Sequence, residues 1–477
     1  MTYFTRRHFI TGLAATAALS PFARTARAAP EASKITATTR VIEVKGKAAT
    51  VFSLESKTGF IFDAGQDIRL TLANRLSEPT LVHWHGQTPP SEQDGVPMLS
   101  QPPLKPGESY SYEFHPRPGT HWMHSHVGLQ EQKLLAAPMI LRDKADLAAD
   151  VQEHVVLLHD FTFRDPQEIL AELKAGGGDH AAHGSGGASG DMSGMDHSKM
   201  ASGEPSAMLN DVRFDAFLAN DRTLDDPEIL RAEPGGRVRL RIINGAAASN
   251  MWVDPGQLEA QLIAVDGNAI MPLREKLFPL AVAQRIDLAI ELPREEGAWP
   301  ILFRPEGTTA RTGIIIATGD GKIAKIAGEG EMTPAVDLAM ELRMRASKSL
   351  RPEPVTRTEM LMLTGGGADY VWGLNGKPSL QHETLFGVRL GERIAVMIHN
   401  MTQMSHPMHL HGHHFQVIDI GGQKIAGALR DTVLVPPQAA VTIAFDADNP
   451  GNWAFHCHHL YHMNAGMMGA VAYVNAA

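Results

Sequence analysis

The 477-residue chain has a single cysteine, Cys457, so no disulfide can form within it. It has no excess of positive charge either. The formal net charge of −10 argues against a nucleic-acid-binding protein. No apolar run reaches the roughly 18 residues that a membrane-spanning helix needs. The length is too great for one hydrophobic core and fits about three domains.

The first 28 residues have the order of features of an export signal. Arg6 and Arg7 form a twin-arginine pattern, a mild apolar stretch runs from Phe9 to about Ala23, and residues 26–28 offer a small-residue cleavage site. The apolar stretch is too short to span a membrane. We therefore predict removal of residues 1–28 and delivery to the periplasm by the twin-arginine export machinery.

One ten-residue pattern occurs three times, at 65–74, 235–244 and 391–400. Each copy begins with glycine, has apolar residues at every second position and ends with asparagine. This alternation predicts a half-buried strand each time. We therefore expect an all-β chain of three Greek-key β-sandwich domains, at 31–143, 151–318 and 359–477, with a linker at 319–358.

Four His-x-His pairs lie at matching distances from these repeats, two in the first domain and two in the third. They are His83/His85, His124/His126, His409/His411 and His456/His458. The equivalent positions of the middle domain, 253–255 and 302–304, contain no histidine. The outer domains are thus expected to supply the metal ligands, and the middle domain none.

Cys457 lies inside the last pair. On a strand its side chain would point away from His456 and His458, because side chains alternate between faces. A lone cysteine is usually a small buried hydrophobic residue, and one His-x-His pair is often a surface feature. Four pairs in register favour metal, and imidazole, thiolate and thioether together select copper. A copper on Cys457 would be joined through covalent bonds to histidines of a second cluster.

These motifs resemble the four signatures of the multicopper oxidases, over nearly all of the chain after residue 28. The signatures are residues 83–86, 119–126, 406–412 and the terminal His-Cys-His. The chain looks most similar to bacterial copper-resistance oxidases, because of the twin-arginine pattern and a Met/His-rich segment. The resemblance implies three cupredoxin domains, four catalytic copper ions and four-electron reduction of O2 to water.

The resemblance also implies a place for each ligand. The type 1 copper would take His406, Cys457 and His462, with Met467 as a weak axial ligand. The type 2 copper would take His83 and His409. The two type 3 coppers would take His85, His124 and His458, and His126, His411 and His456. This trinuclear cluster would lie between the first and third domains.

Three further positions bear on proton supply and tuning. Asp94 stands where the family keeps a catalytic acid beside the cluster, and an exposed loop aspartate is the equal alternative. Met463 stands where many relatives have a glutamate, which leaves the proton route on that side open. Asp431 is interpreted either as structural or as tuning a type 1 histidine.

Residues 180–208 are rich in glycine, serine, histidine and methionine and cannot build a core. We interpret them as an insert in the middle domain that captures Cu(I), because soft ligands suit that ion. The candidate ligands are Met192, Met195, His197 and Met200. A passive linker is the alternative. A second group, Met401, Met404, Met408 and Met463, is either core packing or a thioether path for Cu(I).

The leading hypothesis is an oxidase that consumes Cu(I) and O2 in copper tolerance. A laccase-like oxidase of phenols or aromatic amines stays open, as does a periplasmic protein that sequesters copper. An inactive cupredoxin scaffold is the last alternative, and the complete ligand set argues against it. We expect no nucleic-acid partner, no membrane span and a monomer.

Overall fold

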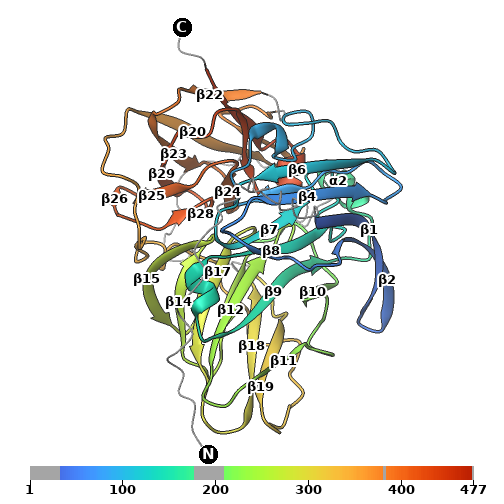
Figure 1. Cartoon of the computed structure of the whole chain (residues 1–477). Helices are drawn as coiled ribbons and strands as arrows, with labels where there is room; N and C mark the ends of the chain where they lie inside the picture. The colour runs from blue at the N-terminus through green and yellow to red at the C-terminus, as the bar shows by residue number, and fades with distance from the viewer. Residues whose placement is uncertain (1–32, 177–208, 380–382, 475–477) are drawn as a thin grey trace, which may run out of the picture. The chain divides into compact units, whose positions relative to one another are not determined.

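The computed structural model describes residues 33–176, 209–379 and 383–474 (Figure 1). In these ranges strands dominate, and they form six sheets that succeed one another along the chain as three pairs. We call them the first pair (33–142), the second pair (152–318) and the third pair (357–473). The prediction of an all-β chain is confirmed.

The first pair consists of two four-stranded sheets. One has the order β2 (Lys47–Ser56), β1 (Ser33–Val44), β4 (Ile68–Asn74) and β6 (Ser109–Phe114). The other has the order β3 (Ile61–Asp63), β8 (Ala136–Arg142), β7 (Gly119–His124) and β5 (His83–His85).

The second pair is built from a six-stranded and a five-stranded sheet. The larger has the order β10 (Ala216–Ala219), β9 (Gln152–Phe161), β12 (Arg237–Asn244), β17 (Arg285–Glu291), β14 (Ala260–Val265) and β15 (Asn268–Glu275). The smaller has the order β11 (Ile229–Ala232), β19 (Thr312–Thr318), β18 (Gly297–Pro305), β13 (Met251–Asp254) and β16 (Phe278–Leu280).

The third pair has the same plan. One sheet has the order β21 (Val371–Leu374), β20 (Arg357–Gly366), β23 (Arg393–Asn400), β29 (Ala440–Asp446), β25 (Phe415–Ile420) and β26 (Gln423–Lys424), with β27 (Leu429–Arg430) also on β25. The other has the order β22 (Thr384–Val388), β31 (Met468–Tyr473), β30 (Asn452–Cys457), β24 (His406–Leu410) and β28 (Thr432–Val435).

The repeated asparagine has the same structural role in each pair. Asn74, Asn244 and Asn400 end β4, β12 and β23, and all three are fully buried. Each side-chain amide donates to backbone carbonyls 2.7–3.0 Å away, two for Asn74 and Asn244 and three for Asn400. One carbonyl of each set lies in the loop that leads to β5, β13 or β24. A buried amide needs such partners. The repeat therefore fixes how the chain enters the next strand. That strand or its end has a His-x-His motif in the first and third sheet pairs and none in the second.

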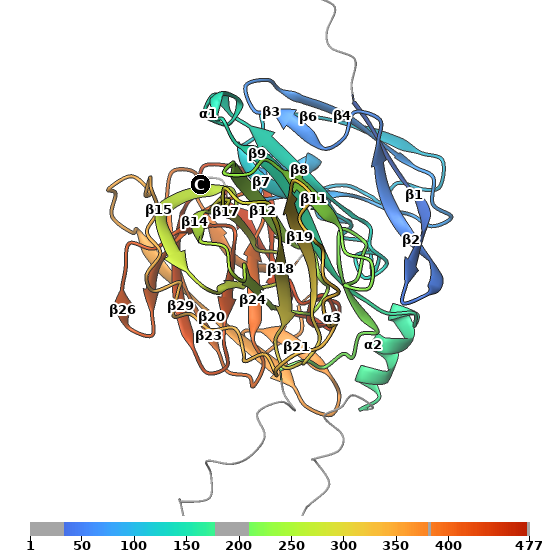
Figure 2. The same ribbon diagram turned by 90° about the horizontal axis from the view of Figure 1, so that it is seen from below.

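The described helices are short: α1 (Lys144–Ala148), α2 (Pro166–Lys174) and α3 (Leu460–Asn464) (Figure 2). None of the helices within the described ranges has the length and apolar character needed to cross a membrane. The predicted export signal and the Met/His-rich insert, with Met192, Met195, His197 and Met200, lie outside the described residues.

Candidate metal centres

Three buried side chains of the third pair meet at one point. His406 begins β24, Cys457 ends β30 and His462 lies in α3. Cys457 Sγ is 3.5 Å from His406 Nδ1 and 3.8 Å from His462 Nδ1, and the two Nδ1 atoms are 3.1 Å apart. Ligands bound at about 2.0–2.3 Å around one ion in a plane lie roughly 3.5–4 Å apart. The triangle therefore has the size that a single metal ion requires.

The far side of each imidazole in this group is held by a polar partner. His406 Nε2 lies 2.8 Å from Thr402 Oγ1, and His462 Nε2 lies 3.1 Å from Asp211 Oδ2. This directs both Nδ1 atoms towards Cys457. Burial raises the pKa of the Cys457 thiol, so the thiol keeps its proton unless a bound cation displaces it.

Met467 is fully buried and belongs to the same turn. Its backbone carbonyl accepts from Cys457 N (3.0 Å), and its backbone N–H donates to His462 O (3.0 Å). Next to it His459 stacks on His462, with ring centroids 3.6 Å apart. The turn therefore brings a thioether-bearing residue to the cysteine and the second histidine together.

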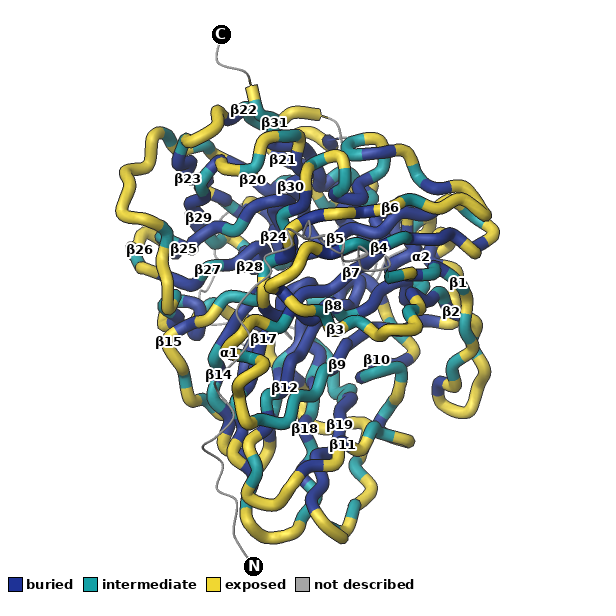
Figure 3. Tube along the Cα trace, viewed as in Figure 1, coloured by how far each residue is buried: buried dark blue, intermediate teal, exposed yellow. Residues whose placement is uncertain are grey.

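Eight buried histidines form a second group, which joins the first and third sheet pairs. Figure 3 shows, by burial, the strands β5, β7, β24 and β30, on or directly after which most of them lie. They are His83, His85, His124, His126, His409, His411, His456 and His458. Strand register explains why histidines of different motifs meet within one sheet pair. His83 on β5 is opposite His124 on β7, and His409 on β24 is opposite His456 on β30. The residues between them alternate, so Trp84 and Met123 point into the core of the first pair.

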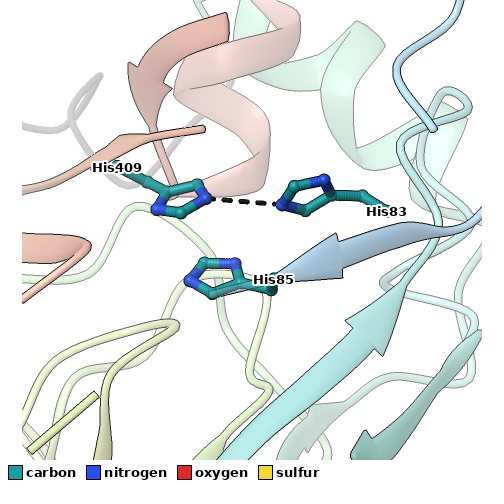
Figure 4. A group of neighbouring side chains, drawn as sticks. All are labelled: His83, His85 and His409. Carbon is teal, nitrogen blue, oxygen red and sulfur yellow. Dashed lines mark hydrogen bonds between the residues drawn. The ribbon is translucent and has the colours of Figure 1, made fainter. Parts of the chain in front are cut away.

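The inward nitrogens of these histidines face one another. His83 Nε2 and His409 Nε2 are 3.4 Å apart and come from different pairs (Figure 4). His124 Nε2 is 3.4 Å from His85 Nδ1 and 3.3 Å from His458 Nε2. His411 Nε2 is 2.9 Å from His456 Nε2, and both ring nitrogens of the nearby His126 are buried without a partner.

Outward partners occupy the opposite ring nitrogens. His83 Nδ1 and His409 Nδ1 lie 2.9 and 2.8 Å from the backbone oxygens of Asp94 and Asp431, respectively. His456 Nδ1 lies 2.9 Å from the carbonyl of Cys457. A neutral imidazole has one N–H, so donation outward leaves the lone pair pointing inward. Converging lone pairs repel one another unless they share a cation, and an outward hydrogen bond that orients the ring is typical of metal-ligating histidine.

Burial keeps these imidazoles neutral, as metal ligands must be. Burial and the neighbouring imidazoles of His458 and His83 hold the pKa of His124 well below its usual range, and burial lowers the pKa of His456 to about 4. Imidazole with thiolate and thioether in the adjoining group suits copper. The donor set of both groups therefore fits copper ions.

Asp94 is buried beside the eight-histidine group, with 1% of its surface exposed. Its Oδ2 accepts from His411 Nδ1 at 2.8 Å, while its backbone oxygen accepts from His83. One residue thus orients a histidine of each outer pair. The alternative of an exposed loop aspartate is wrong, because the turn after β5 folds inward over the cluster.

Asp431 also lies against this cluster rather than against the type 1 candidates. Its Oδ1 is 3.0 Å from His85 Nε2, and its backbone oxygen accepts from His409. Burial alone would raise the pKa of Asp431, but Arg285 holds it well below its usual range. The interpretation that Asp431 tunes a type 1 histidine is wrong. On β24 it contacts His409, whereas the type 1 candidate His406 lies at the start of that strand.

Sequence reasoning missed a second buried acid, Glu131. Its Oε2 is 2.9 Å from His124 Nδ1 and its Oε1 is 3.8 Å from His458 Nδ1. Met463, which replaces the acid of many relatives, is mostly buried in the core of the third pair. The carboxylate of Glu131, in the first sheet pair, therefore reaches His124 of its own sheet pair and His458 of the third. Its position five residues after His126, in a loop otherwise poor in charge, is the signal that could have identified it.

The second pair supplies partners to both groups. Asp211 reaches His462, and Arg285 reaches Asp431. Gly86, the residue after His85, has φ +85°, and a Cβ there would lie 2.5 Å from Arg285 Nη2. Only glycine permits this approach. The domain without histidine pairs thus touches both candidate metal groups through charged side chains.

Known proteins are similar to this chain in sequence and in fold. Models of the multicopper oxidase family match three successive parts of the chain, residues 57–146, 152–320 and 352–477. The chain is 32% identical over 418 residues to multicopper oxidase MmcO of Mycobacterium tuberculosis, covering 86% of this chain and 80% of that protein. The chain belongs to the multicopper oxidases. It is therefore a copper-binding oxidoreductase with O2 as acceptor.

Two further comparisons refine the likeness of this multicopper oxidase. It is 26% identical over 529 residues to copper resistance protein A of Escherichia coli, covering 85% of this chain and 86% of that protein. A multi-copper oxidase from Pseudomonas thermotolerans has the same fold, with a TM-score of 0.70 at 23% identity over 92% of this chain and 98% of that one.

Proposed function

We propose that this multicopper oxidase takes electrons from Cu(I) in the periplasm and uses them to reduce O2 to water in copper tolerance. The observation that carries the proposal is that three consecutive residues, 456–458, link the two groups of metal ligands. Cys457 belongs to the first group, while His456 and His458 belong to the second. A route between the groups therefore needs only covalent bonds of neighbouring residues.

Each group is assigned its ions from the donors just described. The type 1 copper would be held by His406, Cys457 and His462, with Met467 as axial ligand. The type 2 copper would be held by His83 and His409. The type 3 coppers would be held by His85, His124 and His458, and by His126, His411 and His456. Bound there, copper supplies a one-electron acceptor and a store of electrons sufficient for O2.

The protein's own contribution is orientation and exclusion of water. Asp94, Asp431 and Glu131 fix the imidazole rings through outward hydrogen bonds, and their carboxylates surround the cluster. We assign to Asp94 the role of catalytic acid. Its Oδ2 accepts from His411 Nδ1, which leaves the buried Oδ1 as the oxygen that would pass on a proton. The cluster itself is buried, which keeps bulk solvent away from the reacting centre.

The choice of Cu(I) as electron donor rests on two features. The chain is similar over most of its length to proteins named copper resistance protein A. It also has an insert whose Met192, Met195, His197 and Met200 offer the soft ligands that Cu(I) prefers. The same family includes laccases among the relatives of this chain, so oxidation of phenols is the second candidate.

The sequence pattern at the start of the chain supports the proposed location. Arg6 and Arg7, the short apolar stretch and the cleavage motif support export by the twin-arginine route. That route carries folded proteins, which suits a chain whose cluster requires the first and third pairs to have come together. We propose a periplasmic monomer.

Steady-state oxygen consumption by the copper-loaded protein tests the choice of donor. The comparison is kcat/KM for Cu(I) against kcat/KM for a panel of phenols and aromatic amines. We expect Cu(I) to be the better substrate. A phenol that is turned over with the higher kcat/KM would instead make the protein laccase-like, and oxygen uptake with neither class would favour a sequestering protein.

A further inference from the structure

Four methionines are exposed on or at the end of two neighbouring strands of the third pair. Met360 and Met362 on β20 are 61% and 37% exposed, and Met397 on β23 is 38% exposed. Met401 follows β23 directly and is 50% exposed. The two strands lie side by side in both views of the fold (Figures 1 and 2).

Strand register aligns these side chains in adjacent rows. β20 and β23 are parallel, with Met360 opposite Met397 and Met362 opposite His399. Met401 N donates to Leu363 O at 3.0 Å, which continues the same ladder beyond β23. The residues that alternate with them, such as Leu361 and Ile398, are fully buried. The four methionines and His399 therefore share the outward face of the sheet, which we call the thioether face.

This composition is unusual for a solvent-facing strand surface. Outward positions of a strand favour threonine and other β-branched or aromatic residues, whereas methionine normally fills gaps in a core. On β29, the next strand, the same rows continue with Thr442 and Ala440. On β20, β23 and β29 these two rows contain no carboxylate; the nearest one in register, Asp419, stands two strands beyond Met397 on β25. Hard cations such as Mg²⁺ and Ca²⁺ therefore lack their ligands around the methionines.

The donors on this face suit a soft monovalent ion. Neighbouring strands are about 4.8 Å apart, and flexible methionine side chains on adjacent strands can converge over such a spacing. Thioether sulfur selects Cu(I), and imidazole is a compatible further ligand. Met360, Met362, Met397 and His399 thus offer three sulfurs and one ring nitrogen within two rows.

The thioether face ends next to the type 1 candidates. Asn400 closes β23, and its side chain donates to Met404 O at 2.7 Å. Thr402, one residue after Met401, places its Oγ1 2.8 Å from His406 Nε2. The chain therefore leads from the exposed thioethers to a histidine of the Cys457 group within a few residues.

We propose that the thioether face binds Cu(I) as the entry site of the substrate, with Met360, Met362, Met397 and His399 as ligands and Met401 on the side towards His406. This rests on the proposed function, because it names where the Cu(I) substrate is held. It is a different site from the Met/His-rich insert, which belongs to the middle part of the chain.

The test uses Ag(I), a redox-inert soft ion, titrated calorimetrically into the copper-loaded full chain. The patch variant is Met360→Leu/Met362→Leu/Met397→Leu, which keeps volume and apolarity but removes the sulfur. Its control is Met98→Leu/Met271→Leu/Met332→Leu, because these methionines are more exposed, at 73%, 57% and 55%, but lie elsewhere. The insert stays intact in every protein, so its contribution is constant.

We expect the patch variant to lose one Ag(I) equivalent relative to both the wild type and the control. Disturbing even an outer partner of a metal site typically costs about 10–100-fold in affinity. The KM for Cu(I) should therefore rise by about tenfold or more in the patch variant and stay unchanged in the control. Equal Ag(I) stoichiometry and affinity in the wild type and the patch variant would overturn the proposal, as would an equal loss in the control.

The two proposals fail in different ways. Should the wild type bind the extra Ag(I) at this face and yet not oxidise Cu(I), the site stands and the proposed substrate is wrong. Should Cu(I) be oxidised with the same KM by the patch variant and the wild type, the substrate stands and the entry site is wrong.

Discussion

Arg285 and Asp431 form a bidentate ion pair, with Nη1–Oδ1 and Nη2–Oδ2 distances of 2.7 and 2.5 Å and both side chains shielded from solvent. The arginine comes from the second pair and the aspartate from the third. Arg285 Nε also donates to the backbone oxygen of Thr120 in the first pair, at 3.1 Å. Asp431 in turn bonds His85. Arg285 of the second pair thus contacts both pairs that contain the eight-histidine group.

Arg285→Lys should therefore disturb the trinuclear cluster selectively. Lysine cannot make the bidentate contact, and breaking a buried pair costs about 3–5 kcal/mol. We expect loss of type 2 and type 3 copper, by metal analysis and electron paramagnetic resonance, with the type 1 blue colour kept. Arg241→Lys is the control, because Arg241 is equally buried in the second pair and also reaches Thr120, at Oγ1, but pairs with Glu153 and Asp287 rather than with Asp431. Equal copper loss in both variants would show a general folding defect.

Cys457→Ser should remove the type 1 site alone. The hydroxyl cannot replace the thiolate, and the charge transfer from thiolate to Cu(II) that gives the blue colour would vanish. We expect no oxidase activity, an unchanged circular dichroism spectrum and retention of the other coppers. A variant that stays blue would refute the assignment of Cys457.

Asp211→Asn tests the partner of His462. A carboxylate bonded to a ligating imidazole makes the ligand more basic and stabilises the oxidised metal. The neutral amide should raise the type 1 reduction potential by roughly 60 mV, which corresponds to a tenfold shift for one electron. Tyr370→Phe, which removes the hydroxyl that donates to Asp211 but keeps its charge, should shift the potential less. Potentials that do not move in the Asp211 variant would exclude this role.

Glu306 predicts a pH dependence of stability. Burial raises the pKa of Glu306 to about 7, against the opposing hydrogen bonds from Val336 N and Asn250. The folded protein then binds the proton more tightly than the unfolded chain. Its stabilising effect is complete below the unfolded pKa of 4.5 and is lost as the pH rises through about 7.

The free energy of unfolding of the wild type should accordingly fall over this window, by up to about 1.4 kcal/mol per pH unit. The thermal unfolding midpoint should fall with it. Glu306→Gln should lack this component of the slope. The exposed Glu291→Gln serves as control and should keep it. An identical slope in the wild type and the Glu306 variant would show that the carboxyl is already ionised throughout.

The histidine groups could be predicted because they depend on local rules. Alternation along a strand places His456 and His458 on one side and Cys457 on the other, and the repeated asparagine sets the distance to each pair. The contacts of Glu131, Asp211 and Arg285 could not be predicted. They depend on how separate sheet pairs meet, which no spacing along the chain specifies.

The methionines illustrate the same limit. Met404, Met408 and Met463 lie near the type 1 ligands in sequence, yet all three are buried in the core of the third pair, as the packing alternative predicted. Met401, from the same cluster, is exposed. Its companions Met360 and Met362 come from a strand some forty residues earlier in the sequence, and only the parallel register of β20 and β23 brings them together.

The most direct test of Cu(I) oxidation is a simultaneous measurement of Cu(I) and O2 consumed by the copper-loaded protein, with hydrogen peroxide assayed in the same vessel. We predict four Cu(I) oxidised per O2, with no peroxide released and no such uptake by Cys457→Ser. Oxygen uptake no faster than in the absence of protein, or peroxide as the product, would contradict the proposed function.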